Sequence, residues 1–222
     1  MTSLAYAYKE EVEIDVPNGK DATIRVSGES LIEVEPDVAY VYIEIETDGF
    51  TSKEAKKKND RISEDVMEAL EFTYVKNIET DYFNIRERYW GDTSIKEFVA
   101  TNVIKVTTDD IDWVGRIVDK AVNNGATGIR RVSYELSEEK EEEIERKALK
   151  EASENAYEKA LAMAEGLDKE IGDLILIEES NFKYMPYRDV ILEATVVEEF
   201  NTKIFPEDMK IRASITLVYE VI

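Results

Sequence analysis

IRVSGESLIEVEPDVAYVYIEIET, residues 24–47, alternates apolar and polar side chains in two stretches. Such alternation places successive side chains on opposite faces of a β-strand. Pro36 has no N–H for a sheet ladder, so it separates a strand over residues 22–35 from a strand over residues 38–48. We interpret residues 27–30 (Ser-Gly-Glu-Ser) as a bulge or turn, since they lack the G-x-S-x-G pattern of a nucleophile. The apolar face of the second strand carries Ala39, Val41, Ile43 and Ile45.

The elements that follow alternate in a recognisable order. Thr51 and Glu54 form a capping box ahead of the first helix, and Asn124-Gly125 is a typical end for the second. Residues 38–136 therefore read strand–helix–strand–strand–helix–strand, which is the ferredoxin-like βαββαβ order. The expected elements are a helix over 52–72, strands over 78–89 and 97–107, a helix over 110–124 and a strand over 128–136. The expected buried stripe of the first helix is Ala55, Ile62, Val66, Ala69 and Leu70.

The remaining residues predict a second lobe around one long helix over residues 137–167. Alanine recurs at every fourth position of this helix, and small side chains permit another backbone to approach closely. Residues 1–37 and 137–222 together form this second, discontinuous α+β lobe beside the 38–136 lobe. The alanines are Ala148, Ala152, Ala156, Ala160 and Ala164, and further strands are expected over 11–16, 173–179, 190–200 and 209–221.

The composition excludes several classes of function. The chain has 222 residues, 50 of them acidic and 28 basic, a formal charge of −22, and neither His nor Cys. A field of that sign repels phosphate, so nucleic acid is not an expected partner. Without His and Cys, Ser–His–Asp and Cys–His catalysis cannot operate. We therefore expect no catalytic residues, no cofactor and no metal site.

Two acidic clusters leave narrower alternatives open. Asp109, Asp110 and Asp112 could bind calcium or magnesium through carboxylates. The expected role of Asp109 or Asp110 is instead to cap the helix that follows. Residues 138–143 (Glu-Glu-Lys-Glu-Glu-Glu) could form a partner surface, but negative charge also suits the first turns of a helix, and we favour that reading.

The chain shows no signal for a membrane. No apolar run approaches the roughly 20 residues that span a bilayer, and residues 1–10 lack the basic and apolar regions of a signal peptide. We expect no membrane insertion and a cytoplasmic location, or an extracytoplasmic one if a leader preceded this sequence.

Aromatic and methionine side chains gather where loops are expected. Tyr, Trp and Met are enriched at interfaces, so these residues are the predicted contact surface of a homo-oligomer. The alternative is that they cover the ends of the sheets. The predicted interface residues are Trp90, Phe182, Tyr184, Met185 and Tyr187.

Several segments, in order, resemble the SIMPL (DUF541) family. They are residues 26–29 (Val-Ser-Gly-Glu), 33–39 (Glu-Val-Glu-Pro-Asp-Val-Ala), 78–85 (Ile-Glu-Thr-Asp-Tyr-Phe-Asn-Ile), 100–106 (Ala-Thr-Asn-Val-Ile-Lys-Val), 110–126, the alanine-striped helix and 212–219 (Arg-Ala-Ser-Ile-Thr-Leu-Val-Tyr). The resemblance implies exported or envelope-associated proteins, some linked to stress tolerance and some to oligomeric assembly, with no agreed catalytic residues.

Composition and resemblance together predict a non-enzymatic interaction or scaffold protein that self-assembles, possesses no cofactor and takes an unidentified protein partner. The alternatives are a small-ligand binding module with a pocket between the lobes, and a hydrolase driven by carboxylates and a metal.

Overall fold

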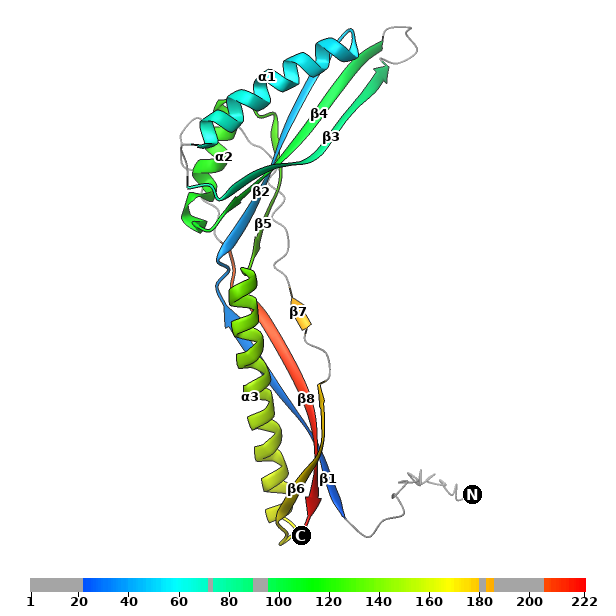
Figure 1. Cartoon of the computed structure of the whole chain (residues 1–222), viewed down its shortest axis with the longest axis vertical. Helices are drawn as coiled ribbons and strands as arrows, with labels where there is room; N and C mark the ends of the chain where they lie inside the picture. The colour runs from blue at the N-terminus through cyan, green and yellow to red at the C-terminus, as the bar shows by residue number, and fades with distance from the viewer. Residues whose placement is uncertain (1–21, 72–73, 90–95, 180–182, 186–205) are drawn as a thin grey trace, which may run out of the picture.

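The computed structural model describes residues 22–71, 74–89, 96–179, 183–185 and 206–222. Within them the chain is α+β, as predicted, with three α-helices and two antiparallel sheets. The two sheets follow one another along the length of the molecule (Figure 1). The strands expected over 11–16 and 190–200 lie outside the described residues.

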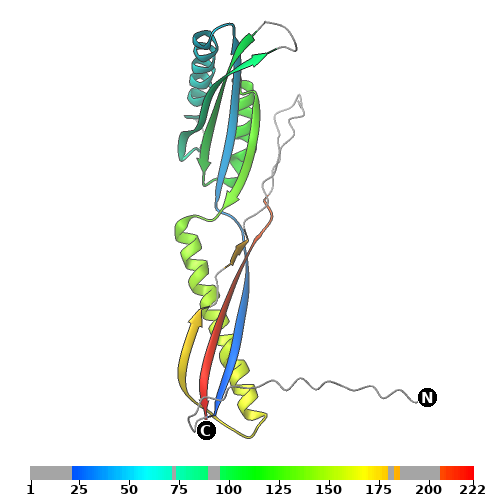
Figure 2. The same cartoon turned by 90° about the vertical axis from the view of Figure 1, so that its right-hand side faces the viewer.

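Sheet B contains strands β2, β3, β4 and β5 and has the predicted ferredoxin-like connectivity. Its strand order is β3-β4-β2-β5, and every neighbouring pair is antiparallel. Helices α1 and α2 pack on one face of this sheet (Figure 2). The elements are β2 (Val38–Gly49), α1 (Ser52–Glu71), β3 (Asn77–Tyr89), β4 (Lys96–Thr108), a 3₁₀ turn (Ile111–Trp113), α2 (Val114–Asn123) and β5 (Gly128–Glu135).

The core of sheet B contains the predicted apolar face and an unpredicted polar group. Val41, Ile43 and Ile45 are fully buried against α1 and α2. Asn59 of α1 is also fully buried, and its Nδ2 donates to the carbonyl oxygens of Ile45 (2.8 Å) and Ala100 (3.2 Å). The expected stripe of α1 therefore missed a side chain that holds the helix to two strands by hydrogen bonds.

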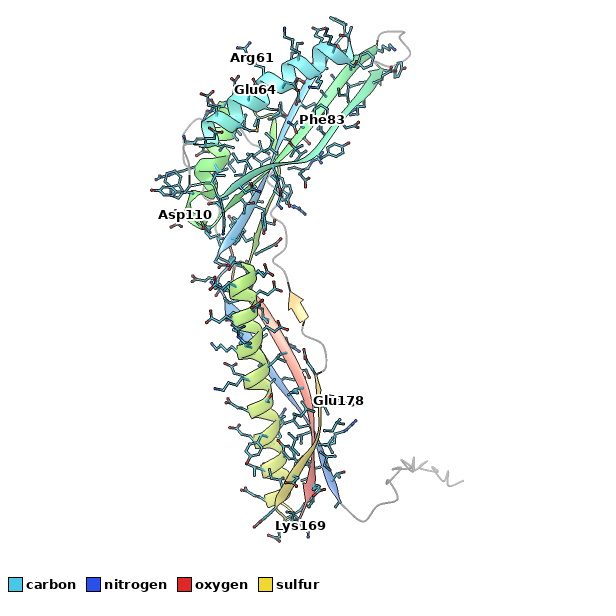
Figure 3. All side chains as sticks on the ribbon, in the orientation of Figure 1. Arg61, Glu64, Phe83, Asp110, Lys169 and Glu178 are labelled. Carbon is cyan, nitrogen blue, oxygen red and sulfur yellow. The ribbon has the colours of Figure 1, made fainter. Side chains whose placement is uncertain are left out.

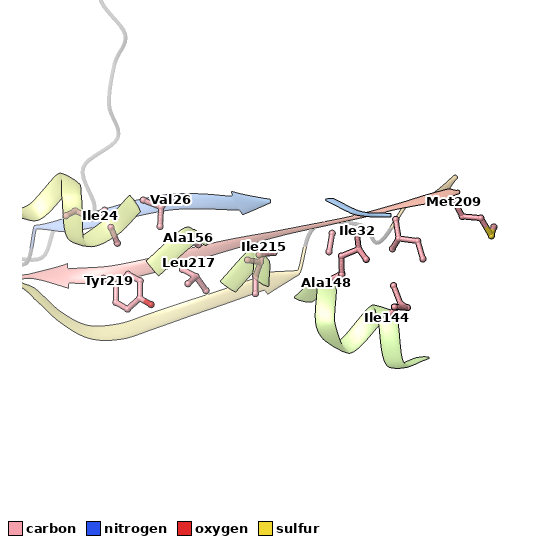
Figure 4. Close-up of a cluster of buried hydrophobic side chains, with 14 of the residues drawn as sticks. Ile24, Val26, Ile32, Ile144, Ala148, Ala156, Met209, Ile215, Leu217 and Tyr219 are labelled. Atoms are coloured by element: carbon pink, nitrogen blue, oxygen red, sulfur yellow. The ribbon is translucent and has the colours of Figure 1, made fainter. Parts of the chain in front are cut away.

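Sheet A contains strands β1, β8, β6 and the short β7. Its order is β1-β8-β6, and β7 pairs with β8. Helix α3 covers one face, and Figure 4 shows the side chains between them. The elements are β1 (Thr23–Val34), α3 (Glu138–Glu165), β6 (Ile171–Glu179), β7 (Lys183–Met185) and β8 (Met209–Val221). The two cores use the segments assigned to two lobes, except that Leu136 packs in the core of sheet A. The independence of those lobes as domains stays a prediction.

The alanine stripe of α3 is completely buried, and it meets β1 at Gly28. A Cβ on Gly28 would lie 2.0 Å from the carbonyl oxygen of Ala152 and 2.5 Å from the amide nitrogen of Ala156. The bulge or turn expected at residues 27–30 is wrong, because β1 pairs with β8 without any shift of register from Thr23 to Val34. This glycine permits contact between two backbones instead of a bend.

A hydroxyl side chain caps the start of two helices: the predicted capping box at α1 is confirmed, and Ser137 caps α3, a contact not predicted from the sequence. Thr51 Oγ1 accepts from the Glu54 amide (3.2 Å), while Glu54 Oε2 accepts from the Phe50 amide (3.2 Å). Ser137 Oγ accepts from the Lys140 amide (3.3 Å) at the start of α3. The acidic run at residues 138–143 therefore occupies the first turns of a helix, as favoured from the sequence.

Candidate interaction site

Three of the five predicted interface residues, Trp90, Phe182 and Tyr187, lie outside the described residues. The other two, Tyr184 and Met185, belong to β7, where their backbones pair with Ile211 and Lys210 of β8. The prediction of a loop is thus wrong over residues 183–185. The backbone N–H and C=O groups of β8 form hydrogen bonds with a strand there. The interface role of the five residues stays a prediction.

Strand β6 exposes a continuous apolar run at an edge of sheet A. It pairs with β8 on one side, and no strand of the described ranges pairs with its other side. Its four central residues are between 37% and 59% exposed: Leu174, Ile175, Leu176 and Ile177. An edge strand with an apolar centre offers unpaired backbone hydrogen-bonding groups and an apolar surface to another strand.

The apolar surface continues from β6 onto α3 through Tyr219 of β8. Leu174 pairs with Tyr219 across the sheet, and the centre of the Tyr157 ring of α3 lies 6.1 Å from the centre of the Tyr219 ring. Tyr157 is 45% exposed, whereas Tyr219 is buried, and this burial raises the pKa of the Tyr219 phenol. We name Leu174, Ile175, Leu176, Ile177 and Tyr157 the β6 patch. It comprises the exposed apolar run of the strand edge and an exposed ring on α3, each next to the buried Tyr219.

Charged groups frame the β6 patch without entering it. Figure 3 shows Glu178 near one end of β6 and Lys169 in the turn before its other end. A guanidinium nitrogen of Arg25 lies 3.6 Å from a carboxylate oxygen of Glu178, so part of the negative charge at that end is balanced. Asp173 of β6 directly precedes the four apolar residues, and these four carry no charge, in a chain whose formal charge is −22.

An acidic cleft of about 650 Å³ lies between the link from β1 to β2, the residues after β4 and the residues before β8. The predicted acidic triplet contributes to it, but no group of three or more acidic residues is close enough to hold a metal ion in the parts of the chain that the structure describes. Its lining comprises Glu35, Pro36, Tyr74, Asp109, Asp110, Ile111, Asp112, Pro206 and Asp208.

The expected carboxylate cap at Asp109 or Asp110 is wrong. Asp110 stands at the cap position of the 3₁₀ turn, yet its side chain makes no capping hydrogen bond, and Trp113 occupies the corresponding position of α2. Thr108 Oγ1 instead accepts from the Asp110 amide (3.1 Å). The hydroxyl of Thr108, at the end of β4, therefore bonds the backbone at this turn, whereas the Asp110 carboxylate makes no capping bond.

The face of sheet B opposite its helices is lined by paired aromatic and charged side chains. The Lys105 ammonium lies 4.6 Å from the centre of the Tyr40 ring and donates to Glu79 Oε1 at 3.0 Å. That hydrogen bond raises the pKa of Lys105, while burial and then the charge of Glu135 raise the pKa of Tyr40. These charges are engaged with each other, so this face is a weaker candidate for an interface than the β6 patch.

Sequence reasoning missed the β6 patch although a signal was present. Leu174 to Ile177 are four consecutive apolar residues. In a strand with one solvent-exposed face, apolar and polar residues alternate instead. Such a run predicts burial on both faces. In sheet A the run lies at an edge instead, so its second covering element is absent from the described part of the chain.

No helix among the described residues is long and apolar enough to cross a bilayer.

Comparison with known proteins places the chain among a defined set of relatives. A family model described as "SIMPL: Protein of unknown function (DUF541)" matches residues 24–219. Relatives named "Uncharacterized protein YggE" from Escherichia coli strain K12, Escherichia coli O157:H7 and Shigella flexneri are each 25% identical over 177 residues. Each match covers 78% of this chain and 70% of the relative. Because the family match extends over nearly the whole chain and includes both sheets, the chain belongs to the SIMPL (DUF541) family.

Proposed function

We propose that this protein is a non-enzymatic interaction or scaffold protein that assembles with copies of itself through the β6 patch. The observation that carries the proposal is the exposed apolar run of β6 at an edge of sheet A. Pairing two such edges forms backbone hydrogen bonds and removes apolar side chains from water together.

The net charge opposes association, and salt reduces that opposition. Two chains of formal charge −22 repel each other at long range. Salt screens exposed charges over about 8–10 Å near physiological ionic strength, whereas burial of apolar surface is worth roughly 25 cal/mol per Å². Contact between the apolar residues of β6 gains the apolar term, while salt screens the carboxylates of Asp173, Glu178 and Glu179 beside them. Association is therefore expected to strengthen with salt.

The test compares two substitutions with matched exposure. Ile175 on β6 and Leu31 on β1 are both 52% exposed and both belong to sheet A. Ile175→Lys introduces a charge into the proposed interface and weakens association by at least about tenfold. Leu31→Lys adds the same charge elsewhere and leaves association near the wild-type level. Sedimentation equilibrium at about 0.1 M and about 0.5 M salt measures both effects.

Two results would contradict the proposal. One is a wild-type mass of 25.5 kDa at every protein and salt concentration. The other is an equal effect of Ile175→Lys and Leu31→Lys. A Trp90→Ala, Tyr184→Ala variant tests the sequence-based prediction that the loop aromatics also contribute. A metal-dependent activity lost on Asp110→Ala would overturn the non-enzymatic part.

The acidic cleft favours a second function, the binding of a small cationic ligand. Its volume falls within the range of roughly 300–1,000 Å³ that ligand pockets occupy. Carboxylates of Asp110, Asp112 and Asp208 repel anions, while Tyr74 offers an aromatic face to a cation. Calorimetric titration with spermidine tests it: binding lost on Asp110→Asn, Asp112→Asn supports this function, and absence of heat at millimolar ligand rejects it for polyamines.

A further inference from the structure

The two outer edges of sheet A differ in what their backbone groups contact. On β1, the carbonyl oxygen of Ser27 accepts from Lys159 Nζ at 2.9 Å, and the amide of Glu29 donates to Asn155 Oδ1 at 3.2 Å. The backbone groups of residues 27 and 29 point to the same side of the strand, because alternate residues do so. Since both groups bond side chains of α3, that side is the one away from β8. Two side chains of α3 therefore occupy the positions that a further strand would use.

Helix α3 reaches this edge because β1 has no side chain at Gly28. The missing Cβ permits the helix backbone to touch the strand backbone, and Ser30 Oγ donates to the Ala148 carbonyl oxygen at 2.8 Å beside it. A neighbouring strand would have to lie about 4.8 Å from β1. The Asn155 and Lys159 side chains stand in that space over the middle of β1.

We infer that, among the described strands, sheet A admits a second copy on its β6 side and not at β1, because Asn155 and Lys159 close the β1 edge, and that assembly through this sheet therefore stops at a pair. The inference rests on the proposed function and adds the number of copies and the residues that limit it. When two β6 strands pair, the joined sheet ends in a closed β1 edge on each side. Opening β1 leaves an acceptor edge at both ends, which permits growth into longer arrays.

The sequence of β6 is compatible with pairing to itself. In an antiparallel pair centred on Leu174, Ile171 lies opposite the second copy's Ile177 and Asp173 opposite its Ile175. Lys169, in the turn before β6, comes near the second copy's Glu179. The same register brings Glu170 opposite Glu178, whose charge Arg25 partly balances. A two-fold arrangement repeats each contact twice, which produces a closed pair rather than a chain.

The experiment opens the β1 edge in the full chain with Asn155→Ala, Lys159→Ala. Alanine is a strong helix former and both positions lie outside the buried stripe, so the fold is retained and circular dichroism verifies it. Light scattering is expected to give twice the 25.5 kDa chain mass for the wild type and larger, concentration-dependent masses for the variant. Amide exchange at Glu29 is expected to accelerate at least about tenfold in Asn155→Ala, independently of assembly.

A control and a second variant separate the possible outcomes. Glu158→Ala alters an exposed residue of α3 midway between Ala156 and Ala160 and is expected to behave as wild type. Adding Ile175→Lys to the opened variant should reduce its mass by removing the β6 contact. A wild-type pair that stays a pair after opening, or a wild type larger than a pair, overturns the inference while the proposed function stands. A wild-type monomer overturns the proposed function, and then association of the opened variant alone still assigns Asn155 and Lys159 as the edge closure.

Discussion

Sheet A and sheet B meet their helices in different ways. In sheet A, the alanine stripe of α3 touches β1 at Gly28, where the two backbones leave no room for a Cβ. In sheet B, large side chains such as Ile43 and Leu70 separate α1 from the strands, and Asn59 joins them by hydrogen bonds. Packing of the helix on sheet A therefore requires small residues at the contact, whereas packing of the helices on sheet B uses large apolar side chains.

This difference in helix packing affects which apolar side chains each sheet leaves exposed to solvent. One narrow helix cannot cover a sheet on its own, and α3 follows β1 and β8, so β6 is left with exposed apolar residues at the edge. In sheet B, two helices share the covered face. The buried residues of β2, β4 and β5 form one core there, and Ile78 of β3 packs against it partly buried. The proposed interface is therefore a consequence of how closely α3 approaches β1.

The largest expected effect is on the backbone contact of sheet A. Gly28→Ala places a methyl group against the Ala152 carbonyl oxygen, so α3 must move and the free energy of unfolding falls by about 3 kcal/mol. Gly128→Ala in β5 is the matched control, because no atom lies within 4 Å of the added Cβ. Urea unfolding measures both. Equal losses would show that strand propensity, and not helix contact, explains the glycine.

A middle-sized effect is expected from the buried amide of sheet B. Asn59→Ala removes the donor shared by the Ile45 and Ala100 carbonyl oxygens and leaves both buried, at a cost of about 2 kcal/mol in the free energy of unfolding. Asn123→Ala, on the exposed end of α2, is expected to change the same free energy by less than about 0.5 kcal/mol. An Asn59 variant as stable as the wild type would mean that aliphatic packing alone holds α1.

The smallest effect is expected from alkaline pH, and it compares one tyrosine from each sheet. Burial raises the pKa of Tyr219 in sheet A and of Tyr40 in sheet B. A pKa raised above its unfolded value near ~10 contributes stability that is fully present below that pH and is lost as pH rises through the folded pKa. Tyr219→Phe and Tyr40→Phe should each lose less stability than the wild type between about pH 9 and about pH 11. Urea midpoints that fall as steeply in both variants as in the wild type would disprove the assignment.

Much of the fold was predictable because local rules and burial agree. Alternation around Pro36 specified β1 and β2, and the Asn124-Gly125 end of α2 follows from the left-handed backbone that Gly125 adopts at φ +103°. The site was harder to predict. The aromatic residues proposed from loop positions fall mostly outside the described residues. The four consecutive apolar residues of β6 indicate burial, but no local pattern reveals that they lie at a sheet edge.

The sequence by itself determined the α+β class, the ferredoxin-like order of sheet B, the long alanine-striped helix and the family, since each depends on periodicity or on residues near in sequence. Only the tertiary structure decided why Gly28 is a glycine, because the atoms that a Cβ would meet lie more than 120 residues away in α3. The same holds for the edges of sheet A. Whether a strand is central, closed by Asn155 and Lys159, or open like β6 depends on which distant segments pack beside it, and backbone hydrogen-bonding groups are alike in every strand.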